Sequence, residues 1–342
     1  MTSVGVQEAD GAAQSVPRRV LAVDIGGTKI NAAVVSLPGA QLGTVHTTPT
    51  PAARGAQAVV QAALSVAREA LEADKADHAP GGGGEAAPLV AVGIASAGVI
   101  DAERGVVTSA TGALPGWPGT DLAGAFGEAF GAPARALNDV HAHGLGEYAF
   151  GVGQGRDALL LVAIGTGIGG AIIAHSRVLT GAGGAAGHIG HVSVSGVPGA
   201  SDLTCSCGRV GHLEGFASGP GIAAELTRRG VAADSTREVA AIANDPSHEG
   251  SRAALGVLMD AGFATGRAIG GLLNVLDPGL VAITGGVSSA DGAAGNAWWG
   301  ALVEGVEHDA MDAVAHTPLV VARAGNYAAL LGAAAFAVQP AP

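Results

Sequence analysis

Hydrophobic and polar positions in the first fifty residues predict a small antiparallel sheet. A short apolar run, Val20 to Asp24, is followed by a glycine pair, and Lys29 to Leu37 then continues the strand pattern. Gln41 to Thr47 is a third segment of strand composition. Because only a few residues separate the three segments, we expect them to form an antiparallel meander.

Helical and strand segments alternate over the next hundred residues, which is typical of an α/β fold. Helices are expected at Ala56 to Ala73 and Leu122 to Phe130, and strands at Leu89 to Ala95 and Ala134 to Leu137. Val99 to Val107 has the composition of a hairpin.

A second strand, glycine turn and strand lies in the middle of the chain. It consists of Ala158 to Ile164, the turn Gly165 to Gly170, and Ala171 to Ala174, and it repeats the arrangement at Val20 to Val35. Two such units, one in each half, indicate two related α/β domains that face a cleft. The expected elements of the more helical remainder are helices at Pro220 to Arg229, Thr236 to Ala243, His248 to Leu276 and Ala328 to Ala337, and a strand at Leu280 to Thr284.

Two segments are expected to be flexible. Residues 1–17 are small and polar and contain no apolar run of the kind found in a signal peptide. Residues 74–88 include four successive glycines, which favour a loop without fixed structure.

Composition supports a large folded core and argues against nucleic-acid and membrane partners. Hydrophobic residues make up 48% of the 342 residues and charged residues 13%, and the net charge is −12. An acidic chain without basic runs is not expected to bind a phosphate backbone. The most apolar window, residues 158–174, is broken by glycines and is shorter than a membrane span. We therefore expect a soluble, cytoplasmic protein whose two cysteines stay reduced.

Both cysteines and three of the 11 histidines fall within the segment His188 to His212. The pattern Cys205-Ser-Cys-Gly-Arg-Val-Gly-His212, with His191 upstream, offers the thiolate and imidazole ligands that tetrahedral Zn²⁺ prefers. Such a site has no open position, so we interpret it as structural zinc that fastens a loop next to Glu214. The alternative is a pair of buried thiols with solvated histidines.

The first glycine turn belongs to the motif Asp24-Ile-Gly-Gly-Thr-Lys29 at the tip of a predicted hairpin. Gly26 and Gly27 let backbone N–H groups approach a phosphate, Thr28 can donate a hydrogen bond, and Asp24 can hold Mg²⁺ through water. A tight hairpin turn with a capping aspartate is the competing interpretation.

The second glycine turn formally matches the dinucleotide fingerprint, because it reads Gly165-x-Gly167-x-x-Gly170. That motif must open a helix and be followed about 20 residues later by an acidic residue, and neither condition holds here. We therefore interpret it as a turn between two strands that contacts nucleotide phosphates. Gly285-Gly286, after the late strand, either lies under an adenosine or is an ordinary turn.

Asn138-Asp139 stands at a strand-to-helix junction. Asp139 is a good N-cap for the helix expected to run to Glu147, and helix capping alone would explain the pair. The functional alternative is a general base that takes the proton of a sugar hydroxyl during phosphoryl transfer.

Together these segments resemble the ROK family of repressors and sugar kinases. The resemblance covers about residues 18–337 and rests on seven segments in a specific order: Asp24 to Lys29, Gly93 to Gly98, Asn138-Asp139, Gly165 to Gly170, Gly187 to His191, Cys205 to Glu214, and Gly285-Gly286. It implies a two-domain actin/hexokinase-like ATPase fold, related to ribonuclease H, with an interdomain cleft. The implied small domain is 18–137, closed by the C-terminal helix 326–338, and the large domain, 138–325, carries the zinc-binding loop.

The resemblance also implies a role for each motif residue, with ATP, Mg²⁺ and structural Zn²⁺ as cofactors. Asp139 would be the catalytic base, and a homodimer is expected. The ATP-binding residues would be Asp24, Gly26, Gly27, Thr28, Lys29, Gly165, Thr166, Gly167, Gly285 and Gly286. The substrate-binding residues would be Asn138, Asp139, His188, His191 and Glu214, and the zinc ligands His191, Cys205, Cys207 and His212.

The chain departs from the usual family pattern at two positions. His212 stands where a third cysteine is usual, and imidazole is a competent zinc ligand. His188 replaces the glutamate of most family glucokinases, whereas bacterial N-acetylmannosamine kinases resemble this chain in having Ala-Gly-His-Ile-Gly-His. A neutral imidazole suits an amide carbonyl better than a pair of hydroxyls. We therefore predict 6-phosphorylation of a hexosamine, N-acetylmannosamine first, with glucokinase as the enzymatic alternative and a non-catalytic sugar-sensing regulator as the other.

Overall fold

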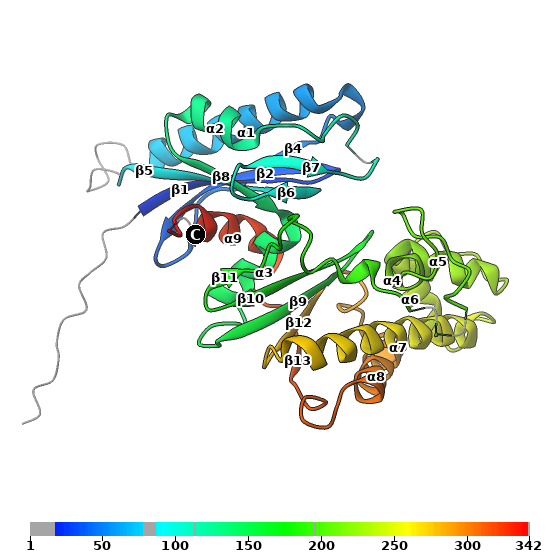
Figure 1. Cartoon of the computed structure of the whole chain (residues 1–342). Helices are drawn as coiled ribbons and strands as arrows, with labels where there is room; N and C mark the ends of the chain where they lie inside the picture. The colour runs from blue at the N-terminus through cyan, green and yellow to red at the C-terminus, as the bar shows by residue number, and fades with distance from the viewer. Residues whose placement is uncertain (1–17, 78–86, 113, 195, 198, 341–342) are drawn as a thin grey trace, which may run out of the picture.

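The computed structural model describes residues 18–77, 87–112, 114–194, 196–197 and 199–340. Two β-sheets lie one above the other with helices around and between them (Figure 1). In the described part of the chain, every helix is too short or too polar to cross a membrane.

The first sheet brings the ends of three parallel strands to one edge. Its strands are β1 (Arg18–Ile25), β2 (Lys29–Leu37), β3 (Gln41–Leu42), β4 (His46–Pro49), β5 (Leu89–Ser96) and β8 (Ala134–Asn138), in the order β3-β2-β1-β5-β8 with β4 paired to β2. β1 and β2 are antiparallel, whereas β5 and β8 run parallel to β1. Because Ile25 pairs with Ser96 and Ser96 with Asn138, the glycine turn after β1 and the Asn138-Asp139 pair share the carboxyl edge.

Alternating side chains of β1 cover the two faces of this sheet. Leu21 and Val23 pack with α1 (Ala56–Asp77) and α2 (Leu122–Phe130), and Val20 and Ala22 face α9 (Ala328–Ala337) on the opposite side. The outer side also carries the 3₁₀ turn η1 (Ala52–Arg54) and the hairpin of β6 (Val99–Asp101) and β7 (Val106–Ser109). Figure 1 shows α1 and α2 above the sheet and α9 below it.

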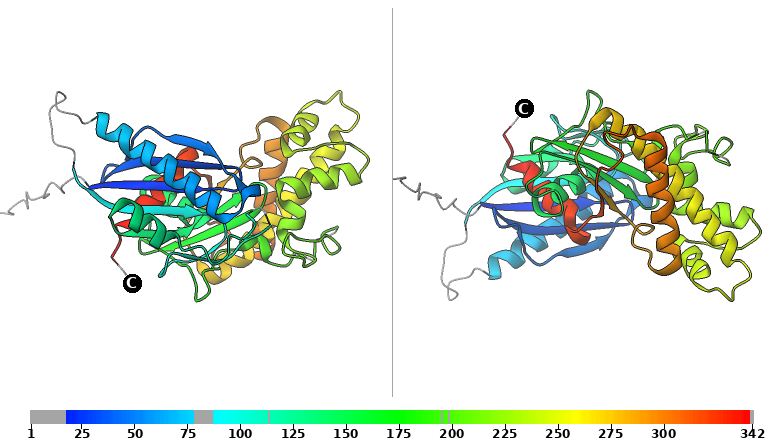
Figure 2. Two further views of the ribbon diagram at one scale, coloured as in Figure 1. Left: turned by 90° about the horizontal axis from the view of Figure 1, so that it is seen from above. Right: turned by 90° about the horizontal axis from the view of Figure 1, so that it is seen from below.

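The second sheet repeats the arrangement of the first with larger helices. Its order is β11 (Arg177–Val178), β10 (Ile168–Ala174), β9 (Ala158–Ile164), β12 (Val281–Thr284) and β13 (Leu319–Val321). Its helices are α4 (Leu213–Ala217), α5 (Gly219–Arg228), α6 (Thr236–Asn244), α7 (Ser251–Leu276) and α8 (Gly292–Asp309), and η2 (Ile189–His191) and η3 (Gly325–Tyr327) are single 3₁₀ turns. Viewed from above and below, this helical part extends beyond the first sheet (Figure 2).

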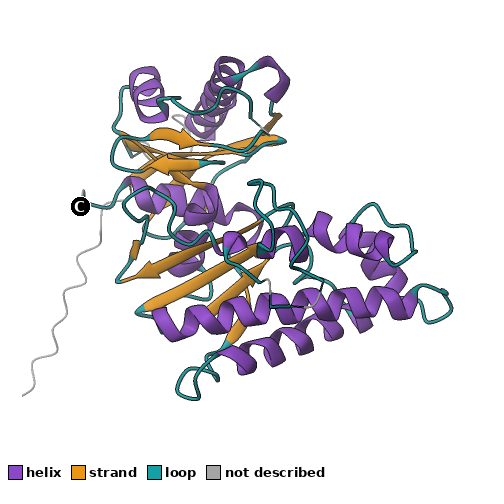
Figure 3. Cartoon of the chain, turned by 45° about the vertical axis from the view of Figure 1, so that its right-hand side comes forward, coloured by secondary structure: helices purple, strands orange, loops and turns teal. Residues whose placement is uncertain are grey.

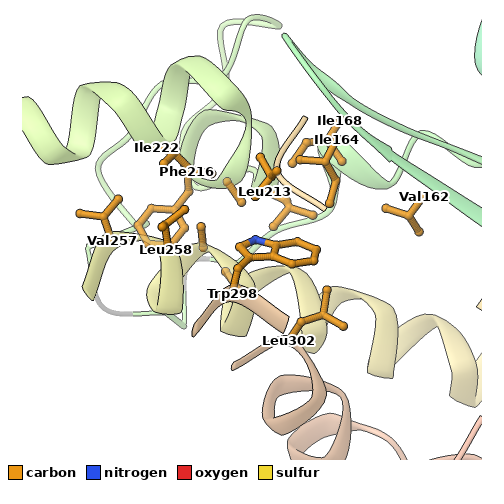
Figure 4. Packing of buried hydrophobic residues seen from close by; sticks show 14 of the residues in the cluster. Val162, Ile164, Ile168, Leu213, Phe216, Ile222, Val257, Leu258, Trp298 and Leu302 are labelled. Carbon is orange, nitrogen blue, oxygen red and sulfur yellow. The ribbon is translucent and has the colours of Figure 1, made fainter. Parts of the chain in front are cut away.

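Trp298 of α8 lies at the centre of the core under the second sheet. Its indole contacts a buried cluster to which Ile164, Phe216 and Leu258 contribute (Figure 4). α7 and α8 run side by side beneath the strands (Figure 3). Gly262 and Gly266 of α7 face the backbone of α8, so the two helices approach more closely than larger residues would allow.

Two helices, α3 (Asp139–Phe150) and α9, lie between the sheets. α9 packs on the first sheet, and Val140 and Tyr148 of α3 pack on the second. A Cβ on Gly332 of α9 would overlap the Ala142 carbonyl oxygen of α3. We call this backbone-to-backbone contact the α3–α9 crossing; it joins the two halves of the molecule.

Most predicted elements are confirmed, and several details are wrong. The expected third strand, 41–47, is split into β3 and β4, and the elements α4, α8, β11 and β13 were not expected. Gly169 and Gly170 belong to β10 rather than to the turn, because they pair with Ala163 and Val162 of β9. The N-cap of α3 is Asn138 and not Asp139.

Two further predictions remain untested. The expected flexible segments 1–17 and, for the most part, 74–88 lie outside the described residues, and α1 continues to Asp77. The assignment of residues 18–137 and 138–325 to two domains stays a prediction.

Candidate functional site

Two cavities meet at the N-terminus of α3. The large cavity, about 690 Å³, is lined by Asn138, Asp139, His188, His191 and Glu214, among others. The smaller of the two, about 310 Å³, is lined by Asp24, the turn 26–29, Asp139, Val140, His143, Asn326 and Ala329. We call it the phosphate-side cavity after the phosphate contacts that the sequence predicts for its glycine turn. Because Asp139 lines both, its carboxylate can act on groups that approach from either side.

The carboxylate of Asp139 is held in one orientation. Its Oδ1 accepts hydrogen bonds from Val140 N and from Asn138 Nδ2, both at 2.9 Å. Burial raises the pKa of Asp139 well above its usual range, although these hydrogen bonds and the nearby His188 oppose the shift. A carboxylate with a raised pKa is a stronger base once it is ionised.

Asn138 is fully engaged in positioning Asp139. Its Oδ1 accepts hydrogen bonds from Val140 N at 2.9 Å and from His141 N at 3.1 Å. Its Nδ2 donates to Gly98 O at 2.9 Å as well as to Asp139. The structure therefore shows Asn138 as a helix cap and a support for Asp139, and the predicted contact of Asn138 with a sugar hydroxyl stays a prediction.

Asp24, on β1 of the first sheet, is a second carboxylate that lines the phosphate-side cavity. It lies one residue before the end of β1, opposite Asn31, whose Nδ2 donates to Asp24 Oδ2 at 3.4 Å. Burial, followed by repulsion from Asp139, raises the pKa of Asp24 to about 6. A second carboxylate that raises the cost of ionising Asp24 in the same cavity favours the binding of a cation there.

The loop that carries His188 is held from two sides. Gly187 has φ +81°, and a Cβ there would lie 2.5 Å from Gly170 O, so a larger residue would displace the loop from β10. On the other side, the Nε2 of His141 hydrogen-bonds Ala186 O at 2.7 Å. His188 lines the large cavity, and its buried Nδ1 has no partner among the described residues.

The four predicted zinc ligands lie together. The ligand atoms of His191, Cys205, Cys207 and His212 all lie within 4.8 Å of one another. Cys205 Sγ is 3.4 Å from His191 Nδ1, and Cys207 Sγ is 3.3 Å from His212 Nδ1. In tetrahedral zinc sites, bonds of about 2.0 Å to nitrogen and 2.3 Å to sulfur place neighbouring ligand atoms roughly 3.5 Å apart. The donor set therefore fits Zn²⁺, and burial favours the neutral imidazole by lowering the pKa of His191.

Glu214 connects this cluster to the second glycine turn. Its Oε2 accepts a hydrogen bond from Ile168 N at 3.0 Å, and its Oε1 accepts one from Ser206 Oγ. A Cβ on Gly167 would lie 2.7 Å from Glu214 Oε2, so a larger residue at this position would push the Glu214 carboxylate aside. Glu214 thereby holds the turn against the Cys/His loop at the wall of the large cavity.

The two other glycine motifs differ in where they lie. Gly165, Thr166 and Gly167 line the large cavity. Gly285 and Gly286 line neither of the two cavities described here, but Gly285 packs on the backbone of Ile164, directly before the second turn. Their predicted contact with adenosine stays a prediction.

Sequence reasoning missed His141, His143 and Asn326. His143 follows Asp139 by four residues, and positions i and i+4 share one face of a helix, so that spacing could have identified it. His141 contacts Ala186 across the fold and Asn326 comes from the far end of the chain, so nothing local in the sequence indicates either.

Comparison with known proteins agrees with this geometry. The sequence model of the ROK family matches residues 20–340. The chain belongs to the ROK family. Among its relatives, a Thermotoga maritima glucokinase is 32% identical over 80% of this chain and 83% of its own length. An N-acetylmannosamine kinase of Escherichia coli O157:H7 is 31% identical over 93% of this chain and 97% of its own length.

A solved structure confirms the fold class of this ROK protein. A ROK family glucokinase from Streptomyces griseus, crystallised with glucose and AMPPNP, superposes with a TM-score of 0.72 at 29% identity. The match covers 94% of this chain and 100% of the other. The predicted actin/hexokinase-like ATPase fold is therefore confirmed.

Proposed function

We propose that this ROK protein transfers the γ-phosphoryl group of MgATP to the 6-hydroxyl of a hexosamine, N-acetylmannosamine first. The observation that carries the proposal is the position of Asp139, a half-buried and oriented carboxylate between the large cavity and the phosphate-side cavity. The S. griseus relative, whose structure holds both glucose and an ATP analogue, supports one sugar and one nucleotide as the two ligands.

In the proposed reaction Asp139 acts as the general base. It accepts the proton of the 6-hydroxyl as that oxygen bonds to the γ-phosphorus, and the bond from the γ-phosphorus to the bridging oxygen breaks, so that ADP leaves with the electron pair. Asn138 holds the base in place through its Nδ2. His191 and Glu214 are the proposed partners of the sugar hydroxyls, because both line the large cavity beside Asp139.

The glycine turns supply the proposed phosphate contacts. Gly26, Gly27, Thr28 and Lys29 line the phosphate-side cavity. Because Gly26 N already donates to Lys29 O at 3.0 Å, the backbone N–H of Gly27 is the proposed phosphate donor of this turn. Asp24 would hold Mg²⁺ through water, and Mg²⁺ when bound neutralises charge on the phosphates. Gly165 to Gly167 are proposed to contact the same phosphates from the second sheet, and Gly285-Gly286 to border the adenosine.

Zinc is proposed to hold the loop rather than to take part in the reaction. His191, Cys205, Cys207 and His212 would bind it, and when bound it neutralises the two thiolates and fixes the loop. The Nδ1 of His191 faces Cys205 Sγ, which leaves Nε2 for a substrate hydroxyl. A homodimer stays a prediction.

His188 supports the preference for an N-acetyl sugar. Its Nδ1 is buried and unpartnered among the described residues, so a sugar that supplies an amide oxygen would satisfy it. Glucose is the second candidate substrate, because relatives of about equal identity include glucokinases. A sugar-sensing role without catalysis is the alternative that the assay below excludes or supports.

The test is a coupled ADP-release assay with N-acetylmannosamine, glucose, N-acetylglucosamine and mannose. We expect Asp139→Asn to lower kcat by about 10²–10⁴-fold while the protein stays folded. Asp312→Asn changes an exposed aspartate and is the matched control. A folded Asp139→Asn protein with near wild-type kcat would refute the assignment of the base, and absence of turnover with all four sugars would refute the kinase.

A further inference from the structure

His143 is a second ionisable side chain of α3 in the phosphate-side cavity. It lies one helical turn after Asp139, on the same face, and lines the cavity with Asp24 and Lys29. The motifs that identify the family do not include this position. Its placement therefore requires an explanation of its own.

The imidazole of His143 carries a nitrogen without a partner. Nε2 is buried and makes no hydrogen bond to any described residue. The neighbouring carboxylate, Glu147, is already engaged, because it accepts hydrogen bonds from Ala324 N and Val152 N. By contrast, His141 on the next face of α3 is paired with a carbonyl oxygen. A buried polar nitrogen without a partner is unfavourable, so a ligand that fills the cavity would improve its environment.

The surroundings of His143 indicate what that ligand is. Burial lowers the pKa of His143 more than the nearby Glu147 raises it, so the free protein holds a neutral ring with one N–H donor. Asp24 and Asp139 would repel an anion that had no cation or donors around it. Lys29 and the glycine turn lie at one wall of the cavity, and His143 adds a donor from the second.

We propose that His143 is a phosphate ligand whose Nε2–H donates to a non-bridging oxygen of the terminal phosphate of ATP. The inference rests on the proposed use of ATP. The terminal phosphate is favoured because Asp139, the proposed base, lines the same cavity, and the group in transfer must lie beside it. Nε2 is buried in the free protein. The proposal therefore includes a flip of the ring about Cβ–Cγ, which exchanges the positions of Nε2 and Cε1 without a change in the backbone.

Three variants at this position separate a hydrogen bond from simple packing. His143→Ala removes the donor, His143→Gln keeps a donor at about the reach of Nε2, and His143→Asn places its donor at the level of Nδ1. His316→Ala changes an exposed histidine and is the control. Calorimetry measures binding of MgAMPPNP and of AMP, and melting temperatures without nucleotide report on folding.

We expect His143→Ala and His143→Asn to weaken MgAMPPNP binding by about 10- to 100-fold, as for the loss of a hydrogen bond to a charged group. His143→Gln should restore most of the lost affinity for MgAMPPNP. AMP, which lacks the β- and γ-phosphates, should bind to all variants with equal affinity. If His143→Ala fails to fold, the difference in MgAMPPNP affinity between His143→Gln and His143→Asn tests the proposal. Equal binding of MgAMPPNP by these two variants, or an equal loss for AMP, would overturn the proposal.

The same experiment distinguishes this proposal from the proposed function. Wild-type protein that binds MgAMPPNP but phosphorylates none of the four sugars contradicts the kinase, while the His143 variants still test the phosphate contact. Wild-type protein that does not bind MgAMPPNP overturns both.

Discussion

Gly332→Ala is the sharpest test of how the two halves of the molecule are joined. A methyl group at this position would overlap the Ala142 carbonyl oxygen at the α3–α9 crossing. Backbone atoms cannot rotate away as the end of a flexible side chain can, so the helices must separate or slide. Ala142 lies one turn beyond Asp139, and the displacement should therefore reach the proposed base.

Two opposing contributions set the expected change in the free energy of unfolding for Gly332→Ala. Alanine is favoured over glycine inside a helix by about 1 kcal/mol. Overpacking a close contact costs about 1–3 kcal/mol, and the upper end applies where the obstacle is backbone, so Gly332→Ala should be less stable by about 2 kcal/mol. A Cβ on Gly300 of α8 would meet no other part of the structure within 4 Å, so Gly300→Ala should raise the free energy of unfolding by up to about 1 kcal/mol.

Thermal unfolding followed by circular dichroism, together with kcat for the preferred sugar, measures both consequences. The melting temperature should fall for Gly332→Ala and rise or stay constant for Gly300→Ala, and kcat should fall for the first variant only. If Gly332→Ala is as stable as Gly300→Ala and keeps wild-type kcat, the α3–α9 crossing is looser than the structure indicates and the reasoning fails.

Three further predictions concern the site. His188→Glu should raise kcat/KM for glucose relative to N-acetylmannosamine by at least about tenfold, and an unchanged ratio would contradict the role of His188. Because the pKa of Asp24 is raised to about 6, Asp24→Asn should be more stable than wild type above that pH, and the gain should shrink as the pH falls from 6 to the ordinary value of 3.8. Below 3.8 wild-type Asp24 is protonated in both the folded and the unfolded state, and a gain that is independent of pH would argue against burial as the cause. Elemental analysis should find about one zinc per chain, which His212→Ala or a chelator should reduce while lowering the melting temperature; metal-free protein with wild-type melting behaviour would refute the zinc site.

Local chemistry made most of the site predictable from sequence. The glycine turns, the Asn138-Asp139 pair and the Cys/His cluster are each contained within a few residues, and the strands around them have simple hydrophobic patterns. The structure brings the predicted metal ligands together although His191 lies 14 residues before Cys205.

Contacts between distant segments account for what was missed. α8 contains four glycines, each unfavourable in a helix by about 1 kcal/mol, and it is stabilised by close packing on α7 that its own sequence does not encode. Whether Asn138 or Asp139 is the N-cap depends on a difference of one residue in where α3 begins after β8. Asp139 is therefore the first helical residue, and its carboxylate lines the cavity instead of capping the helix.

The α3–α9 crossing limits how far Asp139, the proposed base, can move when the two halves of the molecule shift. β8 in the first sheet leads directly into α3, which packs on the second sheet, so Asp139 stands where the chain passes from one half to the other. In a rotation of the halves about this crossing, Asp139 would move little, because it lies one helical turn before Ala142, the residue that contacts Gly332. Such a rotation would change the width of the two cavities while the Asp139 carboxylate, which lines both, kept its position.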